Sequence, residues 1–279
     1  MSIVLNQFEV ASGSVRGRDH ELSGKNNQDA HFISFNDKAL IAVVCDGCGS
    51  GKYSEVGAQI GSRLISQFLL NKINNLTSDV SRNAAVFESV RLDVVANLRI
   101  LANGMGGSLS KTVGDYFLFT VIATVVKEDF IYILTYGDGL FIVNGEALTI
   151  GPFLNNEPPY LGYSISGTSL QEENQKFTSH IFPTCEVSSL LIGCDGVSNI
   201  ISCFDKTLPA REEKVGPISQ FWENDKYFKN PDNVRRRLTI MNTPQMRIDW
   251  KDLSVLNYPG LLPDDTTFIV IRRVKENSP

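Results

Sequence analysis

Residues 39–58, ALIAVVCDGCGSGKYSEVGA, decide the fold. The first seven residues of this stretch are all apolar, which is typical of a strand that is buried on both faces. Asp46 and Gly47 follow at once, and a glycine-rich turn then leads to Ser54. Apolar residues recur at helical spacing over residues 54–70. The stretch therefore predicts a strand, an acidic turn and a helix in direct succession.

Further strands and one more long helix are predicted on either side of this stretch. Ala30–Phe35 is expected to form a hairpin with residues 39–45, and a second helix is expected over residues 80–101. The other expected strands are Phe8–Val15, with Gly13 as a bulge, Phe117–Val126, Ile131–Tyr136, Leu140–Val143, Leu148–Ile150, Ser188–Cys194 and Thr266–Val274. Strands at both ends with helices between them favour an α+β fold, in which two sheets pack together and the helices lie outside.

Residues 1–279 are expected to form a single domain, because no linker or repeat divides the chain. Residues 151–182 are rich in Gly, Pro, Ser and Asn and predict an irregular flap. Residues 200–260 are mixed and partly helical, with 234–241 the clearest helical piece.

The composition is that of a globular protein, with 42% hydrophobic and 20% charged residues among 279. A net charge of −5 argues against a general nucleic-acid-binding surface, which needs a basic face. The longest apolar run, residues 116–126, is too short to span a bilayer, and the first ten residues lack the features of a signal peptide. We therefore expect a cytoplasmic protein with no membrane contact.

Five cysteines, an odd number, fit a reducing compartment. Cys45 and Cys48 form a C-x-x-C motif, but there is no second pair and the chain has only three histidines, so a structural zinc site is not expected. Cys45 and Cys194 each end an apolar run and are predicted to be small residues of the core.

Acidic residues recur where the apolar runs begin or end. They are Asp29, Asp46-Gly47, Asp138-Gly139, Asp195-Gly196 and Asp264-Asp265. If the strands belong to packed sheets, these ends can share one rim, where several carboxylates repel one another unless a cation lies between them. Hard oxygen ligands favour Mg²⁺ or Mn²⁺ over zinc. Glycine after an aspartate would let a carbonyl group or a water molecule approach.

Each Asp-Gly pair could instead be a simple hairpin turn, because this dipeptide is common in such turns. Asp138-Gly139 fits a plain turn best, because a strand follows it directly. Asp46 fits a turn poorly, because its loop continues into a helix. The set of acids is more informative than any single member.

Five motifs in order make the chain similar to the metal-dependent Ser/Thr protein phosphatase family (PPM, type 2C), in particular to its compact bacterial branch. The matching segments are GRDH (17–20) with Gly24 and NQDA (27–30), VCDGCGSGKYSEVGA (44–58), GDG (137–139), CDGV (194–197) and DDTT (264–267). The resemblance extends over nearly the whole chain.

The resemblance implies a four-layer α-β-β-α sandwich, with two antiparallel sheets flanked by helices and a metal site at one end. It implies two divalent cations, Mn²⁺ or Mg²⁺, and a third, weaker one. By the same resemblance, Asp46 would bridge the first two ions and hold the bridging water, Gly47 would offer its carbonyl, Asp195 and Asp264 would complete the first ion, Asp29 would serve the second, and Asp138 with Asp195 would hold the third.

The chain departs from the family pattern at several positions. Gly24 stands where many members carry an arginine that grips the substrate phosphate, and His20, Lys25 and Arg18 are the candidates to replace it. Cys48 stands where animal members place a histidine proton donor, so the leaving group would be protonated in another way. In addition, Gln28 replaces a glutamate and Asp265 an asparagine.

The function implied is a metal-dependent phosphatase that hydrolyses phosphoserine and phosphothreonine in a protein, by attack of the metal-bridging water. No nucleophilic side chain is needed, in agreement with the lack of a G-x-S-x-G motif. The implied partners are a phosphorylated protein and a cognate Ser/Thr kinase of bacterial type. The alternative is a catalytically silent phosphatase-like domain that binds a phosphoprotein or another partner, which Gly24 and Cys48 favour slightly.

Two other motifs carry less weight. Residues 47–52 resemble a phosphate-binding loop, but the glycine spacing is one residue short and Tyr53 replaces the Ser or Thr. The basic cluster VRRRL (234–238) is expected to be a solvated helix face, with phosphoprotein docking as the alternative.

Overall fold

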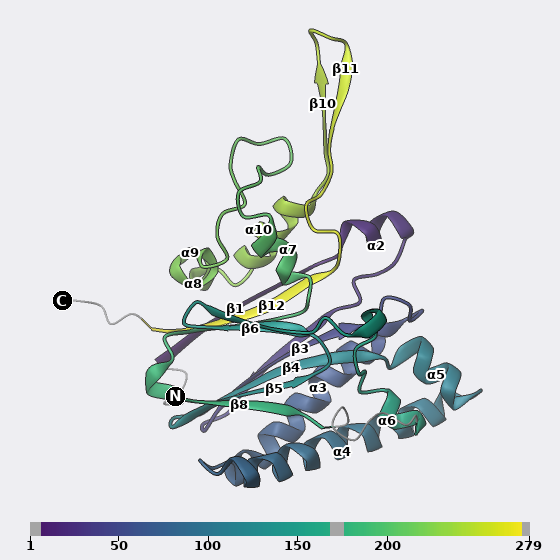
Figure 1. Cartoon of the computed structure of the whole chain (residues 1–279), viewed down its shortest axis with the longest axis vertical. Helices are drawn as coiled ribbons and strands as arrows, with labels where there is room; N and C mark the ends of the chain where they lie inside the picture. The colour runs from purple at the N-terminus through teal and green to yellow at the C-terminus, as the bar shows by residue number, and fades with distance from the viewer. Residues whose placement is uncertain (1–6, 168–175, 275–279) are drawn as a thin grey trace, which may run out of the picture.

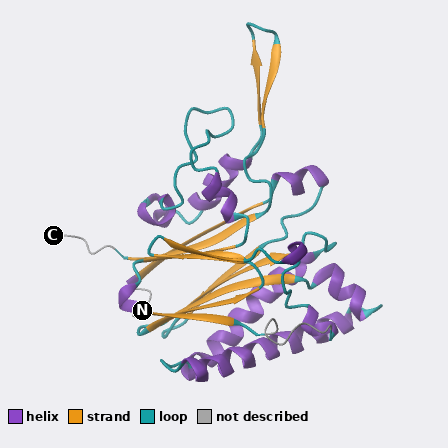
Figure 2. Ribbon diagram, viewed as in Figure 1, coloured by secondary structure: helices purple, strands orange, loops and turns teal. Residues whose placement is uncertain are grey.

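The computed structural model describes residues 7–167 and 176–274, and these form four layers: helices, sheet, sheet, helices (Figures 1 and 2). Both five-stranded sheets are antiparallel, as predicted. The first has the order β1 (Phe8–Val15), β12 (Thr266–Arg273), β9 (Ser189–Gly193), β6 (Gly139–Val143), β7 (Glu146–Ile150). The second has the order β2 (Ala30–Phe35), β3 (Leu40–Gly47), β4 (Phe119–Val126), β5 (Phe130–Tyr136), β8 (Thr178–Pro183).

Helices cover the outer face of each sheet (Figure 1). Over the second sheet lie α3 (Ser54–Lys72) and α4 (Val80–Gly104), followed by α5 (Leu109–Tyr116) and α6 (Tyr163–Ser166). Over the first sheet lie α7 (Val197–Ser202), α8 (Gln220–Glu223), α9 (Lys226–Lys229) and α10 (Asn233–Asn242). The short helix α2 (Arg18–Ser23) joins β1 to β2. Short 3₁₀ turns occupy Ile73–Asn75, Leu154–Asn156 and Thr184–Glu186.

The central strand β3 explains why its sequence is apolar without interruption. Leu40, Ala42 and Val44 belong to the core between the sheets, whereas the alternate residues Ile41, Val43 and Cys45 belong to the core beneath α3 and α4. Successive side chains of a strand point to opposite faces, so a strand between two cores needs apolar residues throughout. Cys45 and Cys194 are both buried, as predicted.

Tight backbone packing fixes helix α3 on the second sheet. A Cβ atom on Gly57 would lie 2.1 Å from the carbonyl oxygen of Tyr116, and one on Gly61 would lie 2.3 Å from the Phe119 ring. The fully buried face of α3 consists mainly of small residues, while the predicted apolar positions Ile60 and Leu64 are only partly buried. Glycine therefore serves here to let the helix approach the chain around β4.

Several predictions about local structure were wrong. Gly13 is not a bulge, because β1 and β12 pair without interruption, and a Cβ on it would meet Val234 of α10 at 2.6 Å. The segment 151–182 is not irregular throughout: it contains α6, and Thr178–Pro183 forms the edge strand β8, which pairs with β5. Helix α5 was not predicted.

A two-stranded hairpin, β10 (Gln245–Asp249) and β11 (Ser254–Tyr258), was also not predicted and projects from the body of the molecule (Figure 1). Its apolar side chains are largely exposed, among them Met246, Trp250 and Leu253. The base of the hairpin is anchored by Asn242, whose side chain donates to the Arg16 carbonyl (2.7 Å) and accepts from the Leu262 amide (2.9 Å). Among the described residues, no helix combines the length and the apolar character that a membrane span requires.

Candidate active site

Four of the predicted acids line one small cavity. Asp46, Asp138, Asp195 and Asp264 contribute to its wall, together with Gly47, Gly49, His20, Cys48, Thr120, Pro158 and Tyr160. The volume of the cavity is about 110 Å³. A water molecule occupies about 30 Å³ in the liquid, so the cavity has room for roughly four groups of that size.

The topology explains why acids so distant in sequence meet. Asp46 lies at the end of β3 in the second sheet, Asp195 follows β9 in the first, and Asp264 precedes β12 beside it. Asp138 lies between β5 and β6, which belong to different sheets. Asp138-Gly139 is therefore not the plain hairpin turn that the sequence favoured but the crossing from one sheet to the other, and it reaches the same rim.

The fifth acid, Asp29, lies deeper. It opens β2 and is 6% exposed, and its carboxylate lies within 4.8 Å of ligand atoms of Asp46 and Cys194. Neither carboxylate oxygen has a hydrogen-bond partner among the described residues. Burying a charged carboxylate without a hydrogen-bond donor costs free energy. An ionised Asp29 therefore needs a cation nearby.

The crowded carboxylates raise one another's pKa. Burial raises the pKa of Asp46 well above its ordinary value, and the charges of Asp29 and Asp195 add to this effect. Burial, followed by repulsion from Asp195 and Asp264, raises the pKa of Asp138 to about 6. No lysine or arginine lines the cavity among the described residues. The site therefore disfavours its own negative charge unless a cation is present.

Such a donor set fits hard divalent cations. Carboxylate and carbonyl oxygens are the ligands that Mg²⁺ and Mn²⁺ prefer, and the unpaired oxygens of Asp29 are the signature expected of an uncompensated ligand set. The Cys194 thiol beside Asp29 accepts a hydrogen bond from the Thr267 amide (3.1 Å).

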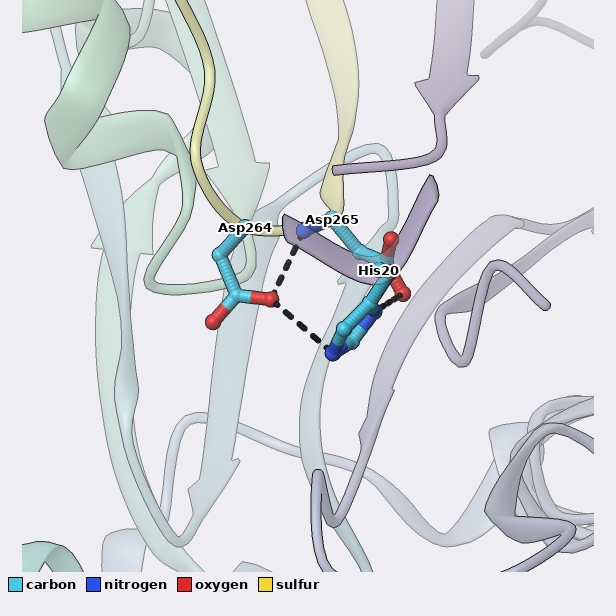
Figure 3. A group of neighbouring side chains, drawn as sticks. All are labelled: His20, Asp264 and Asp265. Carbon is cyan, nitrogen blue, oxygen red and sulfur yellow. Dashed lines mark hydrogen bonds and ion pairs between the residues drawn. The ribbon is translucent and has the colours of Figure 1, made fainter. Parts of the chain in front are cut away.

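His20 lies at the rim, between Asp264 and Asp265 (Figure 3). Its Nδ1 is 2.8 Å from Asp265 Oδ2, and its Nε2 is 3.7 Å from Asp264 Oδ1. Asp265 itself does not line the cavity: it accepts hydrogen bonds from the amides of Gly17 (2.6 Å) and Gln28 (2.5 Å). Asp265 thus ties the segment that carries His20 to the start of β12.

The glycines beside the acids mainly permit close chain packing. A Cβ on Gly47 would lie 2.5 Å from the Gln28 carbonyl, and one on Gly196 would lie 2.0 Å from the Asp265 carbonyl. These contacts hold the acid-bearing loops together, a role different from the open approach that the sequence suggested. The side-chain Nε2 of Gln28 also donates to Ser54 Oγ (2.7 Å) at the start of α3.

Comparison with known proteins agrees with this architecture. The profile of protein phosphatase 2C matches residues 16–234, which is well over half of the chain. The chain belongs to the protein phosphatase 2C family. No match was found among curated protein sequences.

Solved phosphatase structures share the fold at low sequence identity. A bacterial serine phosphatase is 15% identical with a TM-score of 0.53, covering 98% of this chain and 100% of its own. Serine/threonine phosphatase Stp1 from Staphylococcus aureus is 16% identical, with a TM-score of 0.52 and coverage of 99% and 98%. The catalytic domain of serine threonine protein phosphatase PstP, solved with two manganese ions, is 15% identical, with a TM-score of 0.51 and coverage of 96% and 99%.

The sequence offered three residues that could bind the substrate phosphate, and they have different surroundings in this protein phosphatase 2C chain. His20 lines the cavity, whereas Lys25 and Arg18 do not. The Lys25 ammonium donates to the carbonyl of Gly49, which does line it. Arg18 Nη1 donates to the Gly260 carbonyl (3.0 Å) at the base of the hairpin. Of the three, His20 is the one placed to meet a group inside the cavity.

Pro158, Tyr160 and Thr120 also line the cavity of this protein phosphatase 2C chain, and sequence reasoning missed all three. Pro158 and Tyr160 come from the segment expected to be an irregular flap, which has no periodicity that could indicate where its side chains point. Thr120 lies on β4 directly opposite Asp46 in the register, a position visible only once the strand pairing is known.

Proposed function

We propose that the chain is a metal-dependent phosphatase that hydrolyses phosphoserine and phosphothreonine in proteins. The observation that carries the proposal is the convergence of Asp46, Asp138, Asp195 and Asp264 on one cavity, with the unpaired Asp29 beneath. Membership of the protein phosphatase 2C family supports the interpretation of this acidic cavity as a phosphatase active site.

The expected metal ligands are those that the family resemblance implies. Asp46 would serve two divalent cations, Mn²⁺ or Mg²⁺, Gly47 would offer its carbonyl, and Asp195 and Asp264 would complete the first. Asp29 would serve the second ion directly or through water, and Asp138 with Asp195 would hold a third, weaker one. When bound, such ions lower the pKa of a coordinated water and neutralise phosphoryl charge.

The side chains of the cavity would position the attacking water, and the cavity walls would keep the rest of the substrate outside. Asp46 ends a strand that is buried on both faces, and its carboxylate would orient the attacking water. The cavity is large enough for a phosphoryl group beside the ions, and the rest of the substrate would remain outside. Recognition of the phosphorylated protein would then depend on surface outside the cavity.

The proposed partners are a phosphorylated protein and the Ser/Thr kinase that produces it. Five free cysteines support a reducing compartment such as the cytoplasm. The basic cluster of α10 supports phosphoprotein docking weakly, because Arg235 and Arg236 both pair with Asp232, and Arg237 pairs with Glu213. No nucleic-acid or membrane partner is proposed.

The test is turnover of p-nitrophenyl phosphate and of a phosphoserine peptide with Mn²⁺, with Mg²⁺ and with chelator. We expect chelator-sensitive turnover that Asp46→Ala and Asp195→Ala both abolish. Lys38→Ala is a matched control, because Lys38 lies far from the cavity in the β2–β3 turn. Turnover that persists in chelator would contradict the proposal. Metal binding without turnover of either substrate would favour the alternative, a silent domain that binds a phosphoprotein.

A further inference from the structure

Tyr160 is one of three residues of the cavity wall that belong to none of the sequence motifs, the others being Thr120 and Pro158. Tyr160 lies between β7 and α6, in the loop that also brings Pro158 into the cavity wall. The next residue anchors this loop, because the Leu161 amide donates to the Phe119 carbonyl of β4 (3.1 Å). The Tyr160 ring packs edge-on against Tyr163, with ring centres 5.7 Å apart. Tyr160 is therefore held in place rather than left on a free loop.

The hydroxyl of Tyr160 has charged neighbours. The carboxylates of Asp46 and Asp138 line the same cavity and are close enough to act on it electrostatically. Cys48 lines the cavity too, and its thiol contacts Ser50 Oγ (3.1 Å). A phenol is protonated at neutral pH, so the hydroxyl can serve as a donor.

A phosphoryl group in this cavity would need donors that the cavity wall scarcely supplies. Lysine and arginine are absent from the lining among the described residues, and Lys25 is engaged with the Gly49 carbonyl. His20 faces the carboxylates of Asp264 and Asp265. Tyr160 is thus, with Thr120, a neutral hydroxyl donor in the wall of the cavity.

We propose that the Tyr160 hydroxyl donates a hydrogen bond to a phosphoryl oxygen of the substrate and orients this group against the carboxylates of the cavity. The inference rests on the proposed phosphatase function and adds to it a catalytic residue that touches the phosphoryl group. A protonated phenol suits this position, because it contributes a donor without the charge that would compete with divalent cations for the acids.

The experiment compares Tyr160→Phe, which removes only the hydroxyl, with Tyr163→Phe as the matched control from the start of α6. Both proteins are saturated with Mn²⁺, and kcat and KM are measured with p-nitrophenyl phosphate. A hydrogen bond to a charged group corresponds to roughly a 10- to 150-fold change, so kcat/KM of Tyr160→Phe is expected to fall within that range. Tyr163→Phe is expected to stay within about twofold of the unsubstituted protein.

Two further measurements separate contact with the phosphoryl group from a structural effect. The Mn²⁺ affinity measured by calorimetry and the midpoint of thermal unfolding should not change in Tyr160→Phe, whereas a disturbed loop would alter both. Unchanged kcat/KM in Tyr160→Phe, or an equal loss in Tyr163→Phe, would overturn the inference.

Orthophosphate binding keeps the inference testable if the proposed function fails. If the unsubstituted protein hydrolyses neither test substrate, calorimetric titration of the Mn²⁺-loaded protein with orthophosphate still reports on Tyr160. Binding at least about tenfold weaker in Tyr160→Phe would support the contact. Equal dissociation constants, or no orthophosphate binding by either protein, would refute it.

Discussion

Replacing Asp46 by asparagine should stabilise the metal-free protein while it abolishes metal binding. Asp46 is enclosed by four other acids, and asparagine has nearly the same shape without the charge. The same substitution thus removes both a source of repulsion in the empty site and the central ligand of the loaded site.

The size of the effect follows from the geometry. Ligand atoms of Asp29 and Asp46 lie within 4.8 Å of each other, and two unit charges at that distance repel by about 3.5 kcal/mol at an effective dielectric constant of about 20. The figure is a ceiling, because a raised pKa lets one of the two acids take up a proton instead. A gain of this size would raise the midpoint of thermal unfolding by roughly 5–10 °C in chelator. In the unsubstituted protein, Mn²⁺ at a hundred times its dissociation constant should instead stabilise by about 2.7 kcal/mol.

Thermal unfolding in EDTA and in Mn²⁺, followed by circular dichroism, tests both halves of the prediction. The difference in stability should shrink: Asp46→Asn melts higher in EDTA, and adding Mn²⁺ raises the midpoint of the unsubstituted protein alone. Asp37→Asn, on the exposed β2–β3 turn, controls for loss of an acid in general. If Asp46→Asn melted lower than the unsubstituted protein in EDTA, or if Mn²⁺ raised both midpoints equally, the electrostatic argument would be refuted.

The remaining predictions concern pH and packing. The pKa of Asp138 is about 6 in the folded state and 3.8 ordinarily, so its contribution to stability is full below pH 3.8 and is lost as the pH rises through 6. Urea unfolding in chelator should show stability falling between about pH 4 and 7, and Asp138→Asn should reduce that fall; an unchanged slope would contradict the assignment. Phe221→Ala should cost about 3–5 kcal/mol in the same assay, because the ring is fully buried. Gly57→Ala should destabilise by about 1–3 kcal/mol through contact with the Tyr116 carbonyl, whereas Gly104→Ala, with open space around it, should be neutral or stabilising by up to about 1 kcal/mol. Equal changes in stability at the two glycines would show that helix propensity, and not packing, determines the effect of the added methyl group.

The layers and most strands could be predicted because burial leaves a clear mark on sequence. Residues 39–45 are apolar without a break since both faces of β3 are covered, and β1, β2 and β12 begin at the predicted residues. The acids were visible because each interrupts an apolar run at the end of a strand. Elements that are only partly covered show no clear hydrophobic pattern in the sequence. Strand β8 lies at a sheet edge, and the hairpin β10–β11 exposes both its apolar and its polar residues.

Features that depend on pairing between distant segments could not be read locally. The Asp138-Gly139 pair has the composition of a hairpin turn, and only the strand order reveals that it crosses between sheets. Gly13 interrupts a strand pattern because α10, more than two hundred residues later, packs on it. Tyr160 lies in a segment without periodicity, so its place beside Cys48 had no local signal.

The strand order also bears on how the molecule is made. In the first sheet, β12 lies between β1 and β9. Val15 of β1 can therefore pair with Thr266 only after the chain has been synthesised as far as β12. At roughly 5–20 residues per second, a ribosome needs on the order of 10–50 seconds to synthesise the intervening chain. During that interval the edge of β1 has no partner, and Asp264, the last acid of the cavity, has not yet emerged. A nascent chain would therefore expose this edge and would lack a complete set of acids until Asp264 has been synthesised.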